Sequence, residues 1–313
     1  MSTDAHNDLS NKPLGELNDL EIASLTASLK DAEASKRPLV GPLEPLDHLA
    51  QEFLPDSLYR NKVNRLQSDG WSGIRRARGD GDCFYRSFIF SLLETYLPLH
   101  PSHAAHLLTK VESLLPLLTA CGFEESVWED FHEPLQHLLY RMGPEEKDGG
   151  KRKDGEPRLS RDQLVEAFND PETNSCIIVI LRLITSAYLR THEDEFAPFL
   201  FALDDDPRFS ADGGAPTMRQ FCADQVEAVA READHLAIAA LTRALQVPLR
   251  IAYLDQSLFG AQQLAPGDGA SSAASGDAEV NFFEFEDEAA RRGEKGIEGA
   301  LLYRPGHFDM LYR

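Results

Sequence analysis

Cysteine is scarce in this chain, and the few cysteines lie far apart. Only four occur in 313 residues, at Cys83, Cys121, Cys176 and Cys222, with no C-x-x-C pair and no histidine beside them at ligand spacing. This distribution disfavours both a disulfide framework and a zinc site. We therefore expect free thiols, no metal, no cofactor and a reducing compartment, the cytoplasm, with the nucleus as a second location.

Basic side chains are also in deficit. Lysine and arginine number 31 against 52 aspartates and glutamates, which gives a net charge of −21. No stretch alternates basic with aromatic residues. The sequence therefore predicts no nucleic-acid ligand, and a neutral or basic protein partner fits better.

Long hydrophobic runs are absent as well. The longest, CIIVILRLI at residues 176–184, is interrupted by Arg182 and is too short to span a bilayer. The opening MSTDAHNDLS lacks the basic start and apolar core of a signal peptide. We expect a soluble, intracellular monomer without membrane contact.

Two parts of different composition follow one another along the chain. Residues 1–45 are rich in Asp, Glu, Ser and Pro and are predicted to form a flexible arm. Within it, LGELNDLEIASLTASL has the apolar spacing of an amphipathic helix, which would need a partner surface for stability, so binding and fraying are both open. Residues 46–313 are predicted to form one domain, with mobile polar loops at 143–157, 204–216 and 260–280.

Periodicity predicts a helical part followed by strands. Helices are expected over residues 54–66, from Cys83 onward, and over 103–120, 127–142, 160–169, 174–190, 217–232 and 234–246. Capping boxes begin at Ser160 and Thr217. Strands are expected in VPLRIAYLD, VNFFEF, ALLYR and HFDMLYR, which all lie after residue 246.

One cysteine stands at the head of an expected helix. In RGDGDCFYRSF the loop 78–82 turns and a helix begins at or just after Cys83, so the thiol lies at the positive end of the helix dipole, where a thiolate is stabilised. The glycines also let backbone amides converge as donors to an oxyanion. The alternative is that Cys83 is a small apolar residue starting a buried helix, which is the commoner fate of a free cysteine.

One of the ten histidines differs from the rest in its setting. In PGHFD, His307 and Asp309 are two residues apart on an expected strand and project from the same face. Asp309 can hold one ring nitrogen while the other faces a nucleophile, although an incidental pair on a half-exposed strand would show the same spacing. Together with Cys83, the pair supplies the nucleophile, base and orienting acid of a thiol acyl-transfer enzyme.

At these residues a family resemblance becomes visible. DGDCFYRSF at residues 80–88 resembles the Asp-Gly-Asn-Cys-Phe-Tyr-Arg-Ala motif of the ovarian-tumour family of deubiquitinating cysteine proteases. LLYRPGHFDMLYR at 301–313 resembles the otubain branch of that family, and otubain-like stretches at 174–190, 217–232 and 232–254 follow in the same order. The resemblance covers most of the chain.

The resemblance implies a fold, a reaction and a set of partners. The fold would be α/β (α+β) and papain-like, with a small, mostly antiparallel sheet flanked by a larger helical lobe. The reaction would be hydrolysis of the isopeptide bond after the C-terminal glycine of ubiquitin. Ubiquitin and polyubiquitin chains are the implied partners, and ubiquitin-conjugating enzymes are further candidates.

The resemblance also assigns roles to four residues. Cys83 matches the nucleophile, His307 the general base, Asp309 the acid that orients it, and Asp80 the loop that shapes the oxyanion hole. Asp82 departs from the family motif, which has asparagine there, and a carboxylate facing the sulfur would oppose thiolate formation. The alternatives are a protein that binds ubiquitin or a loaded conjugating enzyme and represses ubiquitination without cleavage, and a thiol hydrolase of another acyl substrate.

Overall fold

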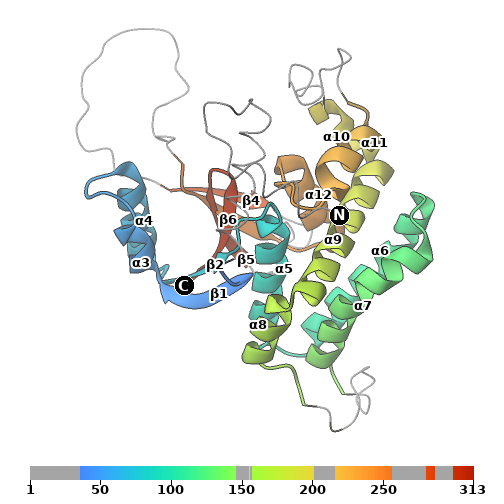
Figure 1. The fold of residues 1–313 in the computed structure, drawn as a ribbon, viewed down its shortest axis with the longest axis horizontal. Helices are drawn as coiled ribbons and strands as arrows, with labels where there is room; N and C mark the ends of the chain where they lie inside the picture. Colours follow the sequence, from blue (N-terminus) through green and yellow to red (C-terminus); the bar gives the residue numbers. More distant parts are fainter. Residues whose placement is uncertain (1–35, 146–154, 156, 201–215, 256–279, 286–298) are drawn as a thin grey trace, which may run out of the picture.

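The computed structural model describes residues 36–145, 155, 157–200, 216–255, 280–285 and 299–313 (Figure 1). The helix expected in the N-terminal arm lies outside these residues. So do most of the loops expected at 143–157 and 204–216 and nearly all of the loop at 260–280.

One mixed sheet is the centre of the described fold. Its strands are β1 (Val40–Pro45), β2 (Gly73–Ala77), β3 (Leu249–Tyr253), β4 (Asn281–Phe285), β5 (Gly299–Arg304) and β6 (His307–Tyr312). They are hydrogen-bonded in the order β1-β2-β6-β5-β3-β4. The strand pair β3–β5 is parallel, and the other neighbouring pairs are antiparallel. The expected small, mostly antiparallel sheet is confirmed.

The first two strands correct the predicted domain boundary. Residues 40–45 form β1, which pairs with β2, so the ordered domain begins before residue 46. Sequence periodicity missed β2 because Arg75 interrupts its apolar pattern. That side chain is nevertheless buried, since its Nη2 donates to Oε1 of Glu94 at 2.9 Å.

Helices lie on both faces of the sheet. The smaller group is α3 (Leu46–Gln51) and α4 (Leu58–Ser68), on the left in Figure 1. The larger lobe on the right contains α5 (Cys83–Tyr96), α6 (Ser102–Ala120), α7 (Glu125–Met142), α8 (Arg161–Asn169), α9 (Pro171–Thr191), α10 (Glu193–Leu200), α11 (Met218–Phe221), a π-helical turn η5 (Cys222–Glu227) and α12 (His235–Leu245).

Successive side chains of β6 point to opposite faces of the sheet, so the strand contributes to two hydrophobic cores. Phe308 and Met310 belong to the large core under α5 and the helical lobe, whereas Leu311 belongs to the small core with α3 and α4. Side chains two residues apart on a strand share a face, which is why the sequence pattern already indicated that Phe308 and Met310 point into a core.

Two expected helices have different limits in the structure. The helix expected from residue 54 begins at Leu58, and Leu54 is 79% exposed in the preceding loop. The helix expected over 217–232 ends at Glu227, and residues 228–234 continue as a loop in which Ala230 has a φ of 58°. Carbonyls of Val226 and Arg231 in this region accept from Arg182, 3.0 and 2.7 Å away, instead of continuing a helix.

Helix α9 passes through the middle of the larger lobe. By length and apolar composition it could cross a membrane, but 67% of its most apolar 18 residues are buried inside the protein. Asp170 caps its start by accepting from the amide of Thr173 at 2.8 Å. This degree of burial is typical of a core helix in a folded domain.

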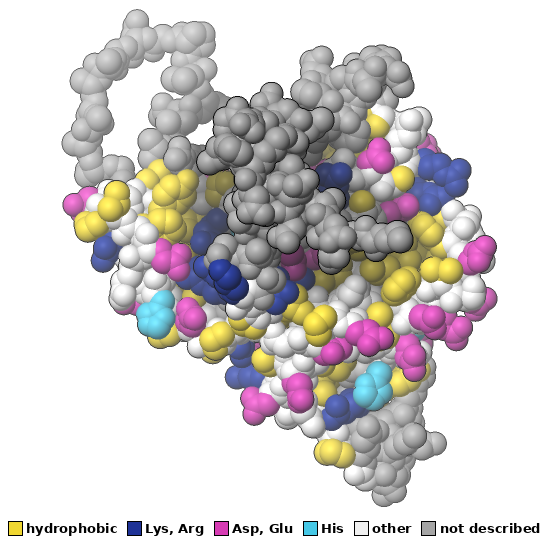
Figure 2. All heavy atoms as spheres, viewed as in Figure 1, with side chains coloured by type: hydrophobic (Ala, Val, Ile, Leu, Met, Phe, Trp, Pro, Cys, Tyr) yellow, Lys and Arg dark blue, Asp and Glu magenta, His cyan; other side chains and the backbone are white. Residues whose placement is uncertain are grey.

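Charge is distributed over the face shown in Figure 2 rather than concentrated. Figure 2 shows acidic side chains spread over the helical lobe and interspersed with lysines and arginines. The net charge of −21 therefore gives this face no single-sign stripe.

Candidate active site

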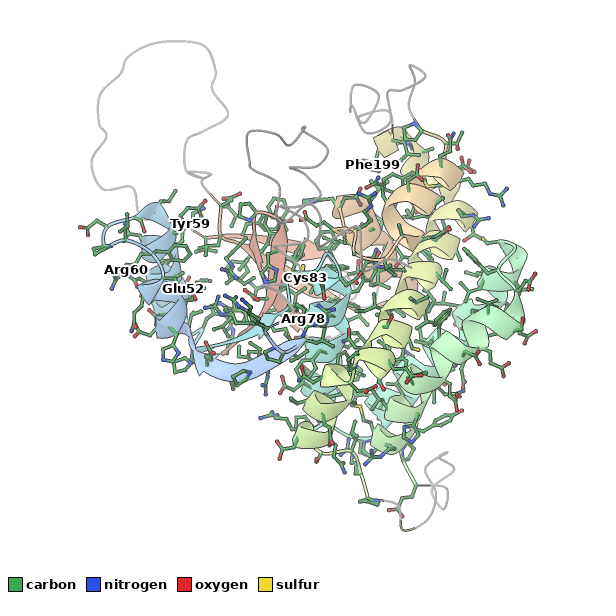
Figure 3. All side chains as sticks on the ribbon, in the orientation of Figure 1. Glu52, Tyr59, Arg60, Arg78, Cys83 and Phe199 are labelled. Carbon is green, nitrogen blue, oxygen red and sulfur yellow. The ribbon has the colours of Figure 1, made fainter. Side chains whose placement is uncertain are left out.

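Cys83 is the first residue of α5, as the sequence predicts. Figure 3 places it between the sheet and the helical lobe. It is 2% exposed, and it is close enough to His307 to contribute to the raised pKa of that imidazole. Cys83 is thus buried, as the apolar alternative expected, and also lies at the helix start where a nucleophile was expected. The first amides of a helix have no acceptor inside it, so the N–H at the start of α5 can serve an oxyanion.

Asp80 fixes the loop before the cysteine. Its Oδ1 accepts from the amide of Asp82 at 3.1 Å, and Arg86, 2% exposed on the first turn of α5, donates to both carboxylate oxygens at 2.9 and 2.8 Å. A bidentate arginine pair holds both distance and orientation. Asp80 therefore holds the loop in place through its carboxylate. The amide of Asp82 is already hydrogen-bonded to that carboxylate.

His307 connects the far end of the chain to this loop. Its Nε2 lies 2.9 Å from Oδ1 of Asp309. Its other nitrogen, Nδ1, lies 3.4 Å from the position that a Cβ on Gly79 would take, so the ring packs directly on the nucleophile loop. The fold therefore brings together the predicted nucleophile, base and orienting acid, which are Cys83, His307 and Asp309.

The protonated form of His307 is favoured in this setting. Burial by itself lowers the pKa of the imidazole, but its interactions with Asp309 and with Cys83 outweigh burial and raise the pKa of His307 to about 9. A thiolate–imidazolium pair is the reactive form of a cysteine hydrolase. The site therefore keeps its acid protonated at neutral pH.

Asp309 is fully buried and held from several sides. Oδ1 accepts from the amide of Ala77 at 3.0 Å as well as facing His307, and Oδ2 accepts from Nη2 of Arg304 at 2.6 Å. Burial alone would raise the pKa of Asp309, but its bond to His307, the nearby cations and the Ala77 amide together lower it. The carboxylate stays charged and cannot rotate away from the imidazole.

A second layer of charges supports that carboxylate. Nη1 of Arg76 lies 3.9 Å from Oδ2 of Asp309. Glu52 pairs with both arginines: its Oε1 lies 2.5 Å from Nη2 of Arg76, and its Oε2 lies 3.8 Å from Nη1 of Arg304. Sequence reasoning missed this network, although Arg304 stands three residues before His307 in the same motif.

Asp82 turns to Arg182 of α9. Its Oδ1 accepts from Nη2 and Nε of that guanidinium, at 2.5 and 3.1 Å, and from the amide of Ala230 at 3.1 Å. The expectation that its carboxylate would oppose a thiolate applied to a side chain that faces the sulfur. The structure shows it paired with a buried cation instead.

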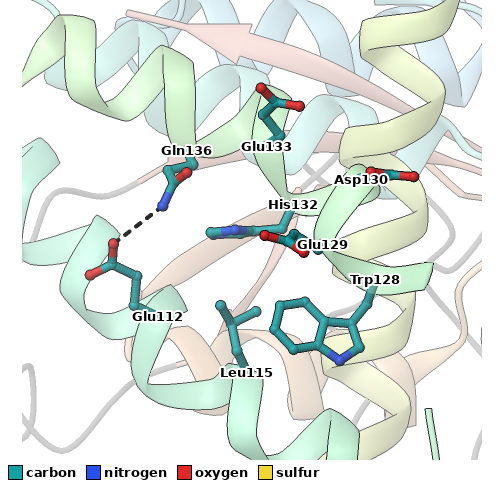
Figure 4. Close-up of a pocket in the computed structure, with 8 residues that line it drawn as sticks. All are labelled: Glu112, Leu115, Trp128, Glu129, Asp130, His132, Glu133 and Gln136. Carbon is teal, nitrogen blue, oxygen red and sulfur yellow. Dashed lines mark hydrogen bonds between the residues drawn. The ribbon is translucent and has the colours of Figure 1, made fainter. Parts of the chain in front are cut away.

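A hollow between α6 and α7 lies outside this set of residues. It has a volume of about 520 Å³ and is lined by Glu112, Leu115, Trp128, Glu129, Asp130, His132, Glu133 and Gln136 (Figure 4). Burial lowers the pKa of His132 and is partly opposed by Glu112. None of the predicted site residues lines this hollow, and no group of three or more potential metal ligands occurs in the described part of the chain.

A thiol at a helix start beside an imidazole that a buried carboxylate holds is the arrangement of a cysteine peptidase. Residues 32–313 match the family model described as Peptidase C65 Otubain. The chain belongs to the otubain family.

Individual relatives agree with that assignment. The chain is 34% identical over 296 residues to "OVARIAN TUMOR DOMAIN-containing deubiquitinating enzyme 1" of Arabidopsis thaliana, which covers 91% of this chain and 84% of that protein. It is 31% identical over 283 residues to "Ubiquitin thioesterase OTUB1" of Homo sapiens, covering 90% and 85%. A solved complex of "h/ceOTUB1-ubiquitin aldehyde-UBCH5B~Ub" has a TM-score of 0.70 at 25% identity, covering 94% of this chain and 97% of that one.

Proposed function

We propose that this protein is a deubiquitinating thiol protease that hydrolyses the isopeptide bond after the C-terminal glycine of ubiquitin. The observation that carries the proposal is the convergence of Cys83, His307 and Asp309, from opposite ends of the domain, in a chain whose relatives are named ubiquitin thioesterases. Cys83 is the nucleophile, His307 the general acid and base, and Asp309 the acid that orients it.

The first half of the reaction forms a thioester. The Cys83 thiolate attacks the carbonyl carbon of the terminal glycine, and the carbonyl electrons move to oxygen. The tetrahedral intermediate collapses as His307 gives its proton to the lysine amine, which leaves. Ubiquitin is then bound to the enzyme through sulfur.

The second half releases ubiquitin with water as the nucleophile. Neutral His307 takes a proton from water, the hydroxide adds to the thioester carbonyl, and the Cys83 thiolate leaves. The amide at the start of α5 is the donor placed for the oxyanion in both halves. Asp80 contributes by holding the loop through Arg86.

Ubiquitin and polyubiquitin chains are the proposed partners. Structural neighbours include complexes of OTUB1 with ubiquitin aldehyde and with UBCH5B~Ub or UBC13~Ub. We extend the proposal to ubiquitin-loaded conjugating enzymes, which such a protein could bind and restrain without cleaving a bond. The intact Cys83–His307–Asp309 arrangement favours catalysis as the principal activity.

The proposal is tested with ubiquitin that carries a C-terminal electrophile, together with a panel of di-ubiquitins. The wild-type protein is expected to form a covalent adduct at Cys83 and to cleave at least one di-ubiquitin. Cys83→Ala should do neither, while Cys222→Ala, which removes another buried free thiol, should retain both activities.

The outcomes separate the alternatives. Ubiquitin binding without adduct or cleavage would support the non-catalytic protein instead. If the protein neither binds nor cleaves ubiquitin but Cys83 still reacts with small thioesters, the substrate assignment is wrong and the thiol hydrolase of another acyl substrate takes its place.

We also propose that the protein works in the cytoplasm, with the nucleus as a second location. All four cysteines are free thiols, as expected in a reducing compartment. Imaging of a C-terminally tagged chain in cells tests this, and a signal confined to secretory compartments would contradict it.

A further inference from the structure

Arg182 is a fully buried cation beside the nucleophile loop. It lies in the middle of α9 with 0% of its side chain exposed, in a helix whose neighbouring side chains are apolar. A buried guanidinium is tolerated only when a counter-charge and hydrogen bonds replace water. Oδ1 of Asp82 supplies the counter-charge at 2.5 Å.

The remaining donors of Arg182 bind backbone carbonyls of two separate segments. Nη1 donates to Val226 at 3.0 Å, and Nη2 donates to Arg231 at 2.7 Å and to Gly81 at 3.3 Å. The guanidinium also packs over the ring of Tyr85, 4.4 Å from its centre. One side chain thus joins the nucleophile loop, the first turn of α5 and the segment 226–231.

The nucleophile loop packs closely against the segment 226–231. Gly81 has a φ of 84°, and a Cβ there would lie 2.3 Å from the carbonyl carbon and oxygen of Ala230. Further along, Oε1 of Glu232 lies 3.1 Å from the position a Cβ on Gly306 would take. The segment 226–231 therefore packs against the loop that carries Cys83, and the next residue, Glu232, lies beside the turn before His307.

Most charges near Cys83 occur as compensated pairs. Asp80 is paired with Arg86 and Asp82 with Arg182, while Asp309 is paired with Arg304 behind His307. The charged or titratable groups contributed by the surrounding segments are His307, Asp309, Arg304, Arg76, Arg78, Asp80, Arg86, Asp82, Tyr85, Arg182, Glu227, Arg231, Glu232 and Asp234. Asparagine, the residue of the family motif at position 82, would keep the acceptor oxygen but leave Arg182 uncompensated.

We propose that Asp82 and Arg182 are a positioning pair for Cys83. Arg182 fixes the nucleophile loop against the segment 226–231, and Asp82 neutralises the guanidinium so that no surplus positive charge stands beside the sulfur. This inference rests on the proposed function only in taking Cys83 as the nucleophile.

The test measures how fast iodoacetamide alkylates Cys83 as a function of pH, by mass spectrometry of the peptide that contains it. In Asp82→Asn, the uncompensated charge of Arg182 favours the thiolate, so the midpoint of the alkylation curve should move to lower pH by about one unit. Glu94→Gln is the matched control, because Glu94 is a buried carboxylate paired with Arg75 at the other end of α5. It should leave the midpoint unchanged.

Steady-state kinetics with a fluorogenic ubiquitin amide separate positioning from stability. Asp82→Ala removes the acceptor for Arg182 and Ala230 and should lower kcat by about tenfold or more with KM within about twofold. Asp82→Asn should restore kcat. If the alanine variant does not fold, the asparagine variant still decides the charge effect.

An alkylation midpoint in Asp82→Asn equal to that of the wild type overturns the inference. So does a kcat in a folded Asp82→Ala variant equal to that of the wild type. Because iodoacetamide needs no ubiquitin, a shifted midpoint in a protein that cleaves no ubiquitin would count against the proposed function and leave this inference standing.

Discussion

At the scale of single residues, the site depends on how a few buried charges are held. Asp309 keeps its negative charge although it is fully buried, because His307, Arg304 and the amide of Ala77 all bond its oxygens. That charge in turn helps His307 to retain its proton at neutral pH. The reactivity of Cys83 therefore depends on groups that the thiol does not itself touch.

The pH dependence of kcat/KM should report this arrangement. The pKa of His307 is raised to about 9, so the protonated imidazole is present below that pH and is lost as the pH rises through it. Activity on a fluorogenic ubiquitin substrate should decline over the same range. Asp309→Asn removes a bonded negative charge, so the alkaline limb should move to lower pH and kcat should fall.

Glu195→Gln provides the control for that experiment. Glu195 is an exposed acid on α10 that pairs with Arg243, and its loss should leave the profile unchanged. An alkaline limb at the same pH in Asp309→Asn and the wild type would show that Asp309 does not set the protonation of His307.

At the scale of elements, two short loops place the reacting groups. The loop before α5 is held by Asp80 and Asp82, whose partners come from α5 and α9. The turn before β6 contains Gly306 at a φ of 76° and delivers His307 to the start of the strand. Helix and strand are rigid supports, and the loops decide which atoms meet.

Gly81→Ala should test the closeness of that packing. The new Cβ would lie 2.3 Å from the carbonyl of Ala230 at a positive φ, so the backbone must move. We expect a loss of about 2 kcal/mol or more in the free energy of unfolding, measured by urea denaturation, together with reduced Cys83 reactivity.

Gly122→Ala is the matched control. Gly122 also has a positive φ, of 90°, but nothing lies within 4 Å of a Cβ there. Only the conformational cost of about 1 kcal/mol applies, and Cys83 reactivity should be unchanged. Equal effects of the two substitutions would show that the contact with Ala230 has no energetic importance.

At the scale of the whole molecule, the sheet joins parts of the chain that are far apart in sequence. The strand β2 pairs with β1 on one side and with C-terminal β6 on the other. His307 and Asp309 on β6 reach Cys83 because of these pairings. Integrity of the N-terminal edge therefore contributes to the catalytic arrangement.

Two truncations should separate the contribution of β1 from that of the residues before it. A chain of residues 36–313 retains β1 and should unfold at nearly the same temperature as the full chain. A chain of residues 46–313 lacks β1, exposes the backbone of β2 and should unfold at a lower temperature in differential scanning calorimetry. Equal melting temperatures for the two truncations would mean that β1 adds no stability.

Some of this protein could be predicted from its sequence because local patterns were sufficient. The turn before Cys83, the helix after it and the two-residue spacing of His307 and Asp309 each depend on neighbours in the chain. Strands β3 and β6 were also predictable, since Leu249, Ile251 and Tyr253 alternate with other residues in β3 and Phe308 and Met310 do so in β6.

Other features depended on contacts between distant residues, which a local pattern does not contain. Arg182 interrupts an apolar helix without any sign of its partner, because Asp82 lies 100 residues away in sequence. The strand β2 was missed for the same reason, because only the fold shows that Glu94 neutralises the charge of Arg75. The sequence by itself determined which groups can react, because chemistry belongs to residue types. Only the tertiary structure decided how they are charged and oriented, because burial and pairing belong to the packed chain.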